Sequence, residues 1–245
     1  MGVGTKFGTI AETGNNIVTD GLVFNMDAAA YKSYPRTGTN VFNLASGSLT
    51  PTGSLENDVG WEGINPTSSF TFDGSDDYIN LGSSLEINTD AAWSVSFWTN
   101  LTAYSPDYPA PFTIKTDEST GFICFFSELS GYEGINFGSN ANFTRFKTTG
   151  DISASLIGTW NNVTLTYNGS GKTTNSNYII YVNGAVVSLA TPSGYASVTN
   201  TSVIGRIAAS NTFNGGIANF LVYNRALSAA DVLQNFNAGK DRFGL

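Results

Sequence analysis

Large apolar side chains occupy every second position in several short segments of this chain. Trp93–Phe97 and Val163–Tyr167 show this most clearly, with apolar and polar residues in strict alternation. A period of two is the period of a β-strand that buries one face. Asn168-Gly169 and Asn183-Gly184 each follow such a segment, and the Asn-Gly pair favours the positive φ angles of a type I′ hairpin turn. The pattern predicts an all-β protein, an antiparallel sandwich of two sheets.

One hairpin and one loop can be assigned from the residues themselves. The turn at Asn183-Gly184 joins Tyr178–Val182 to Ala185–Val187, and both segments are almost entirely apolar. Apolar runs of this kind are typical of strands covered on both faces, so we expect this hairpin near the middle of a sheet. Pro106–Pro111 contains three prolines, which donate no ladder hydrogen bonds, and it is expected to be a loop.

Only the end of the chain carries clear helix signals. Ser228 is a natural N-cap residue, and Asp231 three positions later completes a capping box. Gly239 is expected to end the helix. The predicted apolar stripe, which would hold the helix on the sandwich as a short lid, consists of Val232, Leu233 and Phe236.

The composition supplies a core and leaves few charges for the surface. Hydrophobic residues make up 41% of the 245 residues and aromatic residues 13%, enough for one core without disulfides or a structural metal. Charged residues make up only 12%, against about 25% in average soluble proteins. The net charge of −8 argues against nucleic acid as a partner, because phosphate binding needs clustered basic residues.

The chain has no histidine and a single cysteine, Cys124. Imidazole proton shuttles, imidazole metal ligands and disulfide frameworks are therefore missing. Cys124 lies in the apolar segment Gly121–Phe126, where we expect a buried thiol without a chemical role. Binding or assembly is accordingly favoured over catalysis.

We divide the chain into an N-terminal arm, residues 1–19, and one domain, residues 20–245. The arm is rich in Gly, Thr and Asn and shows little apolar periodicity. It lacks the basic and apolar regions of a secretory signal, and no apolar run in the chain approaches membrane-spanning length. We therefore expect no secretory signal and no membrane insertion.

Four stretches, in this order, carry a family resemblance: Phe72–Ile79, Thr159–Gly169, Tyr181–Gly184 and Gly215–Leu227. Together they resemble the concanavalin A-like, laminin G-like jelly-roll family, and the likeness covers roughly residues 21–240. The resemblance implies a two-sheet antiparallel jelly roll with one short C-terminal helix. It does not by itself fix a function.

A second resemblance involves the two ends of the domain. Gly21–Ala29 and Leu233–Leu245 look like segments of virion proteins of tailed bacteriophages, particularly those of marine and cyanobacterial hosts. This implies a protein made in the host cytoplasm and exposed on the exterior of a virion. Its partners would be other virion proteins, contacted through the arm or lateral surfaces, and a homo-oligomer would suit such symmetric contacts.

Aromatic residues in loop-like segments are the candidate ligand contacts. Sugar binding needs exposed rings that stack on the apolar face of a pyranose, with amides and carboxylates for the hydroxyls. The candidates are Trp61, Tyr104, Tyr108, Tyr132 and Tyr195. The alternative is that loop aromatics turn back and cap the core. Aromatic residues on strand patterns are assigned to the core, namely Trp93, Phe97, Trp98, Trp160 and Tyr167.

Acidic residues offer a weak metal site and no catalytic pair. Asp73, Asp76 and Asp77 could bind Ca²⁺, but we favour turn chemistry, in which Asx side chains bond their own backbone. No other cofactor is expected. The related glucanases use a Glu-x-Asp-x-x-Glu strand, which is absent; Glu128 and Glu133 are the nearest substitute, five positions apart across a predicted turn.

These observations leave three functional hypotheses. The first is a non-enzymatic structural protein of a virion, which decorates a phage capsid or forms part of a fibre. The second is a carbohydrate-binding adhesin that recognises host-surface glycans, and many weakly binding copies on one particle would combine the two roles. The third and least favoured is a glycoside hydrolase.

Overall fold

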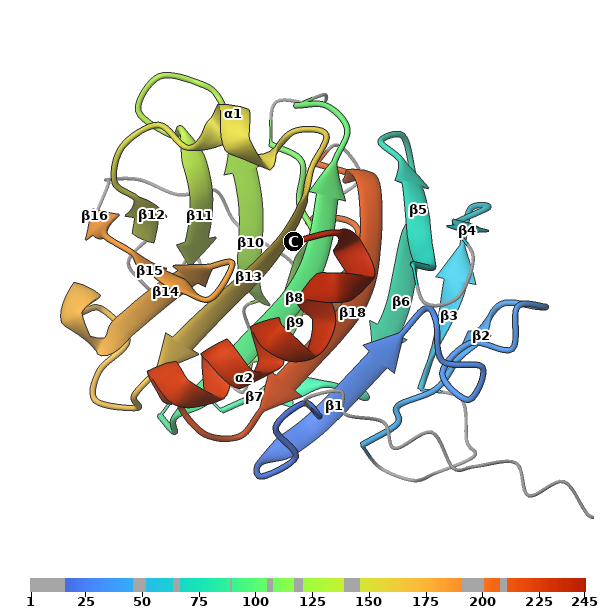
Figure 1. Ribbon diagram of the computed structural model, residues 1–245, viewed down its shortest axis with the longest axis horizontal. Coiled ribbons are helices and arrows are strands. Elements are labelled where there is room, and N and C mark those ends of the chain that lie inside the picture. The colour runs from blue at the N-terminus through green and yellow to red at the C-terminus, as the bar shows by residue number, and fades with distance from the viewer. Residues whose placement is uncertain are drawn as a thin grey trace, which may run out of the picture.

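Two β-sheets packed face to face form the body of the protein (Figure 1). The computed structural model describes residues 16–45, 52–63, 67–88, 90–104, 108–116, 121–138, 146–190, 201–207 and 211–245. The predicted fold, an antiparallel all-β sandwich with one short C-terminal helix, is confirmed. None of the helices in these ranges is both long and apolar enough to cross a membrane.

The first sheet, sheet A, is antiparallel throughout its described pairs. Its order is β15 (Ala185–Val187), β14 (Tyr178–Val182), β13 (Trp160–Tyr167), β8 (Trp93–Leu101), β18 (Asn214–Tyr223), β5 (Ser69–Asp73) and β4 (Gly60–Glu62), with β1 (Leu22–Asp27) also paired to β18. Strands distant in sequence therefore lie side by side at its centre, where β8 separates β13 from β18.

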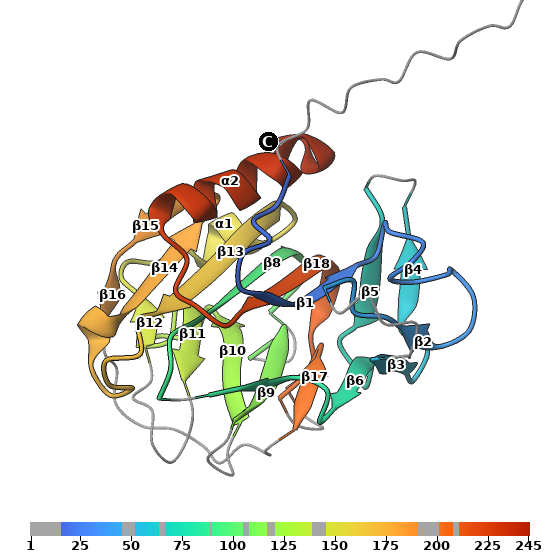
Figure 2. The same cartoon turned by 90° about the horizontal axis from the view of Figure 1, so that it is seen from below.

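The second sheet, sheet B, faces sheet A across the core (Figure 2). Its order is β16 (Leu189–Ala190), β12 (Phe146–Thr148), β11 (Gly134–Gly138), β10 (Gly121–Ser127), β9 (Phe112–Thr116), β17 (Ser202–Ile204), β6 (Tyr78–Gly82), β3 (Gly53–Glu56) and β2 (Asn40–Val41). The short strand β7 (Glu86–Ile87) pairs with β9 in parallel.

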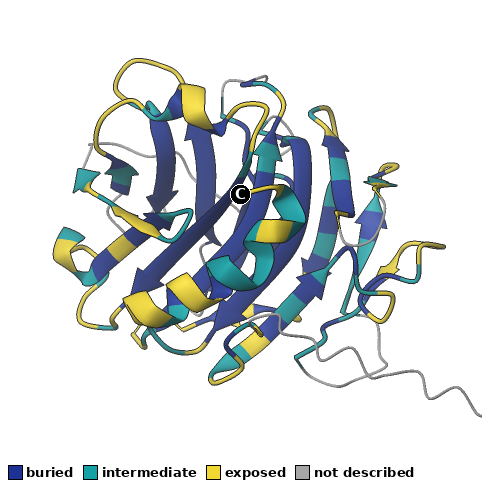
Figure 3. Ribbon diagram, viewed as in Figure 1, coloured by how far each residue is buried: buried dark blue, intermediate teal, exposed yellow. Residues whose placement is uncertain are grey.

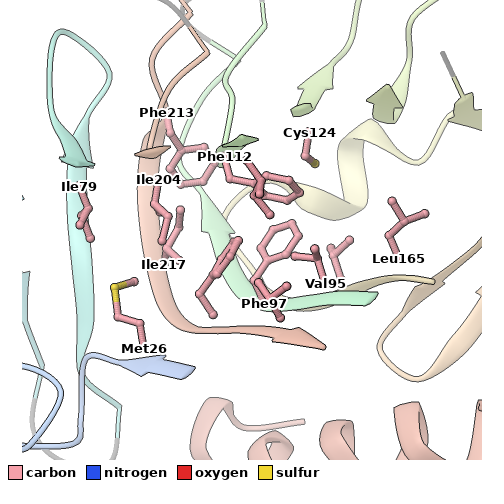
Figure 4. Packing of buried hydrophobic residues seen from close by; sticks show 14 of the residues in the cluster. Met26, Ile79, Val95, Phe97, Phe112, Cys124, Leu165, Ile204, Phe213 and Ile217 are labelled. Atoms are coloured by element: carbon pink, nitrogen blue, oxygen red, sulfur yellow. The ribbon is translucent and has the colours of Figure 1, made fainter. Parts of the chain in front are cut away.

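The core lies between the sheets and is rich in aromatic rings. Phe97 of β8 and Phe112 of β9 meet in it from opposite sheets, with ring centroids 5.5 Å apart and planes at 86° (Figure 4). Trp93 and Tyr167 are also fully buried there, as the period-two pattern predicts. The strands facing this space are buried along most of their length (Figure 3).

The hairpin β14–β15 lies at the edge of sheet A, so its predicted central position is wrong. The turn itself is confirmed, because Asn183 and Gly184 have φ angles of 52° and 77°. β14 is apolar on both faces for a different reason: Ile180 points into the core, whereas Tyr181 joins a second apolar cluster outside the sheet. A helix rather than a neighbouring strand covers that outer face.

Asn168-Gly169 does not form a two-residue hairpin turn. Only Gly169 has a positive φ angle, 81°. The pair opens a longer connection that contains the 3₁₀ turn Asn175–Asn177, and the N–H of Asn168 donates to the carbonyl of Asn177 at 3.0 Å. The Asn-Gly signal therefore located the turn but not its length.

The C-terminal helix α2 (Ala229–Gly239) packs on the outer face of sheet A and confirms the predicted lid. The capping box is present: the N–H of Asp231 donates to Ser228 Oγ at 3.2 Å, and the N–H of Ser228 donates to Asp231 Oδ2 at 2.9 Å. Val232 is buried on the side of the helix that faces the sheet. Leu233 is 48% exposed, so it does not belong to the predicted apolar stripe. The other short helix is α1 (Ser153–Leu156).

The α-helix ends at Gly239 as predicted, but the chain does not turn away from the helix axis there. The chain continues into a 3₁₀ turn, Lys240–Phe243, and the left-handed residue is Gly244 with φ 74°. Gly239 instead allows a close approach, because a Cβ atom built on it would lie 2.6 Å from Trp98 Nε1. The glycine is required by packing rather than by backbone conformation.

Trp98 and Trp160 do not lie in the core, contrary to the sequence assignment. Trp98 follows Phe97, so the alternation of β8 directs it to the outer face, where it is 3% exposed under α2. It stacks on Phe236 and Phe243 at centroid distances of 5.8 and 4.5 Å. Trp160 is half-buried on the same face. The apolar residues on this face are therefore covered by the end of the chain.

Residues 16–19, assigned to the arm from the sequence, are anchored on the domain. The N–H of Val18 donates to Asn235 Oδ1 at 2.8 Å, and Tyr223 Oη donates to the carbonyl of Val18 at 3.0 Å. Gln234 Nε2 donates to the carbonyl of Asn16 at 2.8 Å. The domain therefore includes Asn16 onward, and the rest of the predicted arm, residues 1–15, lies outside the described residues.

Candidate functional site

Two of the predicted contact residues, Tyr108 and Tyr132, come together on the outer face of sheet B. Their ring centroids lie 5.8 Å apart with planes at 68°, and Tyr108 also packs edge-on against Phe125 at 5.4 Å. Tyr108 precedes β9, and Tyr132 lies in the turn between β10 and β11. Both side chains are half-buried. We call Tyr108, Phe125 and Tyr132 the tyrosine patch.

The alternation of β10 explains why an aromatic patch forms here. Phe122, Cys124 and Phe126 point into the core, so Ile123 and Phe125 point to the opposite face. The strand is apolar at every interior position because both of its faces are covered. The small cluster on this outer face consists of Ala110, Ile123, Phe125 and Ile207, with Tyr108 and Tyr132 packed against it.

Polar groups border the tyrosine patch on β11 and β12. Asn136 Nδ2 donates to the carbonyl of Tyr132 at 2.7 Å, while Asn136 Oδ1 is buried and accepts no hydrogen bond from any described residue. Lys147, opposite Asn136 in the ladder, pairs with Glu133 at 2.9 Å. The hydrogen bond from Lys147 is the main cause that lowers the pKa of Glu133 to about 2. Glu133 is therefore held as a carboxylate.

The remaining aromatic candidates do not join this patch. Tyr104 is 8% exposed, and its hydroxyl donates to the carbonyl of Ser153 at 2.7 Å. Burial raises its pKa. Tyr104 caps the core, so its assignment as a ligand contact is wrong. Trp61 is half-buried against the core, and its Nε1 donates to the carbonyl of Ala28 at 2.9 Å. Tyr195 lies outside the described residues.

The acidic cluster is used by the turn between β5 and β6. The N–H of Asp73 donates to Asp77 Oδ2 at 3.0 Å, and the N–H of Ser75 donates to Asp73 Oδ1 at 2.7 Å. One carboxylate oxygen from each of Asp73, Asp76 and Asp77 lies within 4.8 Å of the others. Burial, and then the neighbouring carboxylates, raise the pKa of Asp77, against the backbone hydrogen bond that lowers it. Calcium binding here stays a prediction to be tested.

Glu133, Glu128 and Cys124 each lack a property that catalysis would require. Glu133 is ion-paired, and a carboxyl with a pKa of about 2 cannot act as a general acid near neutral pH. Glu128 is exposed and lies beyond the end of β10. Cys124 is fully buried, and burial raises the pKa of its thiol well above the ordinary value, which suppresses the reactive thiolate.

The sequence did not predict a hollow on the outer face of sheet A. This hollow has a volume of about 170 Å³ and lies beside Trp160, Asn100 and Gly216. The available signal was Gly215-Gly216 inside the mostly apolar strand β18, because glycine in a strand often marks a close approach of another group.

Residues 73–233 match the sequence profile of the concanavalin A-like lectin/glucanases superfamily. The chain belongs to this superfamily. The predicted family is therefore confirmed, and the matched segment runs from the end of β5 into α2. No curated protein sequence shows a significant match to the chain.

Solved structures of the same fold come from varied proteins. Domain 4 of an extracellular arabinanase from Geobacillus stearothermophilus, in complex with arabinotriose, is 16% identical with a TM-score of 0.58; the alignment covers 87% of this chain and 97% of that domain. The receptor-binding domain of botulinum neurotoxin type G is 15% identical with a TM-score of 0.58; the alignment covers 89% of this chain and 51% of that domain. Trypanosoma rangeli sialidase is 13% identical with a TM-score of 0.59; the alignment covers 94% of this chain and 34% of the sialidase.

The alignments cover different shares of these three proteins. This superfamily member spans about half the length of the toxin binding domain and a third of the sialidase, but nearly all of the arabinanase domain. At these identities the likeness establishes the jelly-roll fold alone.

Proposed function

We propose that this protein is a non-catalytic carbohydrate-binding module whose tyrosine patch contacts sugar. The observation that carries the proposal is the meeting of Tyr108 and Tyr132 over Phe125 on the outer face of sheet B. Aromatic rings offer apolar faces to sugar C–H groups. Lys147 and Glu133 border the rings and are partly exposed, so they can reach the hydroxyl groups of a bound sugar. Rings with a few polar groups beside them are a suitable combination for a pyranose.

The fold relatives support a binding role. The arabinanase domain was solved with arabinotriose. The binding domain of botulinum neurotoxin DC was solved with SialylT; it is 16% identical to this chain, and the alignment covers 90% of this chain and 52% of that domain. Both ligand names refer to those proteins. The net charge of −8 favours an uncharged glycan over an acidic one for the present chain, because like charges repel.

The proposal includes no hydrolysis by Glu128 and Glu133, the carboxyl pair nearest to the glucanase motif. A glycosidase needs one carboxyl that donates a proton and a second that acts as nucleophile or base. The lowered pKa of Glu133 removes it from the first role. Incubation with arabinan and related polysaccharides should release no reducing ends, and release at a rate above that of heat-denatured protein would contradict this part of the proposal.

A glycan array with matched variants tests the binding role. Tyr132→Ala and Tyr108→Ala should each weaken binding by about tenfold or more, roughly 1.4 kcal/mol, because each removes a ring from the patch. Tyr31→Ala is the control, since Tyr31 is 65% exposed and lies after β1, on another part of the molecule. Absence of binding to any glycan, or equal losses in all three variants, would refute the proposal.

We propose further that the module works on the exterior of a phage particle, attached to capsid or fibre proteins. The support is the resemblance of Gly21–Ala29 and Leu233–Leu245 to phage virion proteins, together with the low content of charged residues, 12%. Cryo-electron microscopy and mass spectrometry of purified particles test this setting. Detection on particles is expected, and detection in infected-cell lysate alone would refute it.

A further inference from the structure

Five residues aligned across sheet A define a row on its outer face. In the ladder, Trp160 of β13 pairs with Asn100 of β8, Asn100 with Gly216 of β18, Gly216 with Thr71 of β5, and Thr71 with Gly60 of β4. The row lies on the outer face, because Leu101, Ile217 and Phe70, which are chain neighbours of its members, belong to the core. Trp160 shares this face through its pairing with Asn100. Two of the five are glycines, and side chains from the neighbouring strands pack over them: Thr71 over Gly60, and Trp160 over Gly216.

The hollow of about 170 Å³ lies along this row, where Thr71, Asn100, Trp160 and Gly216 are among the residues that line it. Its volume is well below the roughly 300 Å³ at which pockets begin to hold drug-sized ligands. It therefore has room for one small ring rather than for a chain of rings. The residues that give it chemical character are Glu62, Thr71, Asn100, Thr102, Trp160 and Gly216.

Trp160 is a fixed wall of this hollow. A Cβ atom built on Gly216 would lie 3.0 Å from Trp160 Cη2, so the indole reaches over the glycine. Phe243 packs against Trp160 at a centroid distance of 4.5 Å. The neighbouring Arg242 donates to both carboxylate oxygens of Asp27, at 2.8 and 2.9 Å, which holds this end of the chain in place. The indole is thus positioned before any ligand arrives.

The polar side chains of the hollow are not used by the fold. No described residue forms a hydrogen bond or ion pair with the side chains of Glu62, Asn100 or Thr102. Together they offer a carboxylate that accepts, an amide that donates and accepts, and a hydroxyl that does both. The lining contains no lysine or arginine. Such a set suits vicinal hydroxyl groups and disfavours an anionic ligand.

We propose that this hollow, here called the Trp160 pocket, binds a single uncharged sugar ring, such as the terminal unit of a glycan. The indole would contact the apolar side of the ring, and Glu62 and Asn100 would contact its hydroxyls. The proposal shares the ligand class of the proposed function but none of its residues. The pocket lies on sheet A, whereas the tyrosine patch lies on sheet B.

Nuclear magnetic resonance titration with single sugars tests the Trp160 pocket. The probes are galactose, glucose, mannose and N-acetylglucosamine, with N-acetylneuraminic acid as the charged comparison. At least one neutral sugar should shift the Trp160 indole N–H and the Gly216 amide, and the acid should not. Glu62→Ala should weaken that binding by about tenfold. Glu62 and Glu128 are both exposed, so Glu128→Ala is the matched control and should change nothing.

The outcome separates the two proposals. Shifts at Trp160 that survive Tyr132→Ala support the pocket whatever happens at the tyrosine patch. Shifts confined to the neighbourhood of Tyr132 would overturn the pocket and leave the proposed function standing. Absence of shifts at Trp160 with every neutral sugar, equal shifts with N-acetylneuraminic acid, or unchanged affinity in Glu62→Ala would each overturn the pocket. The Glu62 substitution is at an exposed site, so misfolding should not obscure the result.

Discussion

Replacement of Gly239 by alanine should destabilise the protein, although the same change usually stabilises a helix. In an exposed helix interior alanine is favoured over glycine by about 1 kcal/mol. Here the added Cβ would lie 2.6 Å from Trp98 Nε1 and 2.9 Å from Trp98 Cε2. Trp98 has little freedom to retreat, because it is 3% exposed and stacked on Phe236 and Phe243. The clash must therefore be relieved by lifting α2 or shifting the indole.

The two effects can be compared in size. Overpacking a tight contact costs about 1 to 3 kcal/mol, and contacts below 3 Å with a buried, stacked indole place the cost in the upper half of that range, about 2 to 3 kcal/mol. The helix preference returns about 1 kcal/mol. We expect a net loss of about 1 to 2 kcal/mol in the free energy of unfolding. For a chain of this size that corresponds to a fall of roughly 2 to 8 °C in Tm.

Urea denaturation followed by tryptophan fluorescence measures the effect. The midpoint of Gly239→Ala should fall with little change in slope, because the surface exposed on unfolding stays the same. Ala238→Gly is the control in the same turn, and it reports the ordinary propensity cost of glycine in this helix. Equal or greater stability of Gly239→Ala relative to the unaltered protein would show that the helix does not rest on Trp98 as described.

Three further predictions concern single groups. Asp231→Asn should cost about 1 kcal/mol at neutral pH, because it removes the capping box. The hydrogen bond from Arg225 lowers the pKa of Asp231 to about 2, so this stabilisation is present above about pH 4 and is lost as the pH falls towards 2. Denaturation curves of the two proteins should converge at low pH, and a constant gap would contradict the assignment. The Cys124 thiol should react with maleimide only as fast as the protein opens, since it is fully buried; rapid labelling of the native protein would disagree. Calcium titration should leave Tm unchanged, because Asp73 and Asp77 already accept backbone hydrogen bonds, and a rise that grows with calcium would show that the cluster binds the ion.

The sequence predicted the layers of the fold well where one physical signal dominated. Alternation in Trp93–Phe97 and Val163–Tyr167 identified two central strands, because the large apolar side chains of each segment all lie on one face and Ser or Thr residues lie on the other. Ser228 located the start of α2, since capping is a local interaction between residues three apart. Such signals need no knowledge of the rest of the molecule.

The candidate site was predicted less well because burial depends on distant segments. The alternation of β8 and β13 directs Trp98 and Trp160 to the outer face of sheet A, opposite Phe97 and Val163. That the end of the chain returns to cover this face depends on the fold. Tyr104 lies in a loop by sequence, yet the carbonyl of Ser153 holds it inside. Tyr108 and Tyr132 were named individually, but their meeting depends on the fold.

The anchoring of Asn16 beside α2 determines where the module can be tethered. Asn16 and the closing 3₁₀ turn both belong to the outer side of sheet A, next to the same helix. A linker or neighbouring domain joined at either end of the described chain would thus leave from the side opposite the tyrosine patch. A row of such modules fixed to a surface would present those rings outward, towards whatever approaches it.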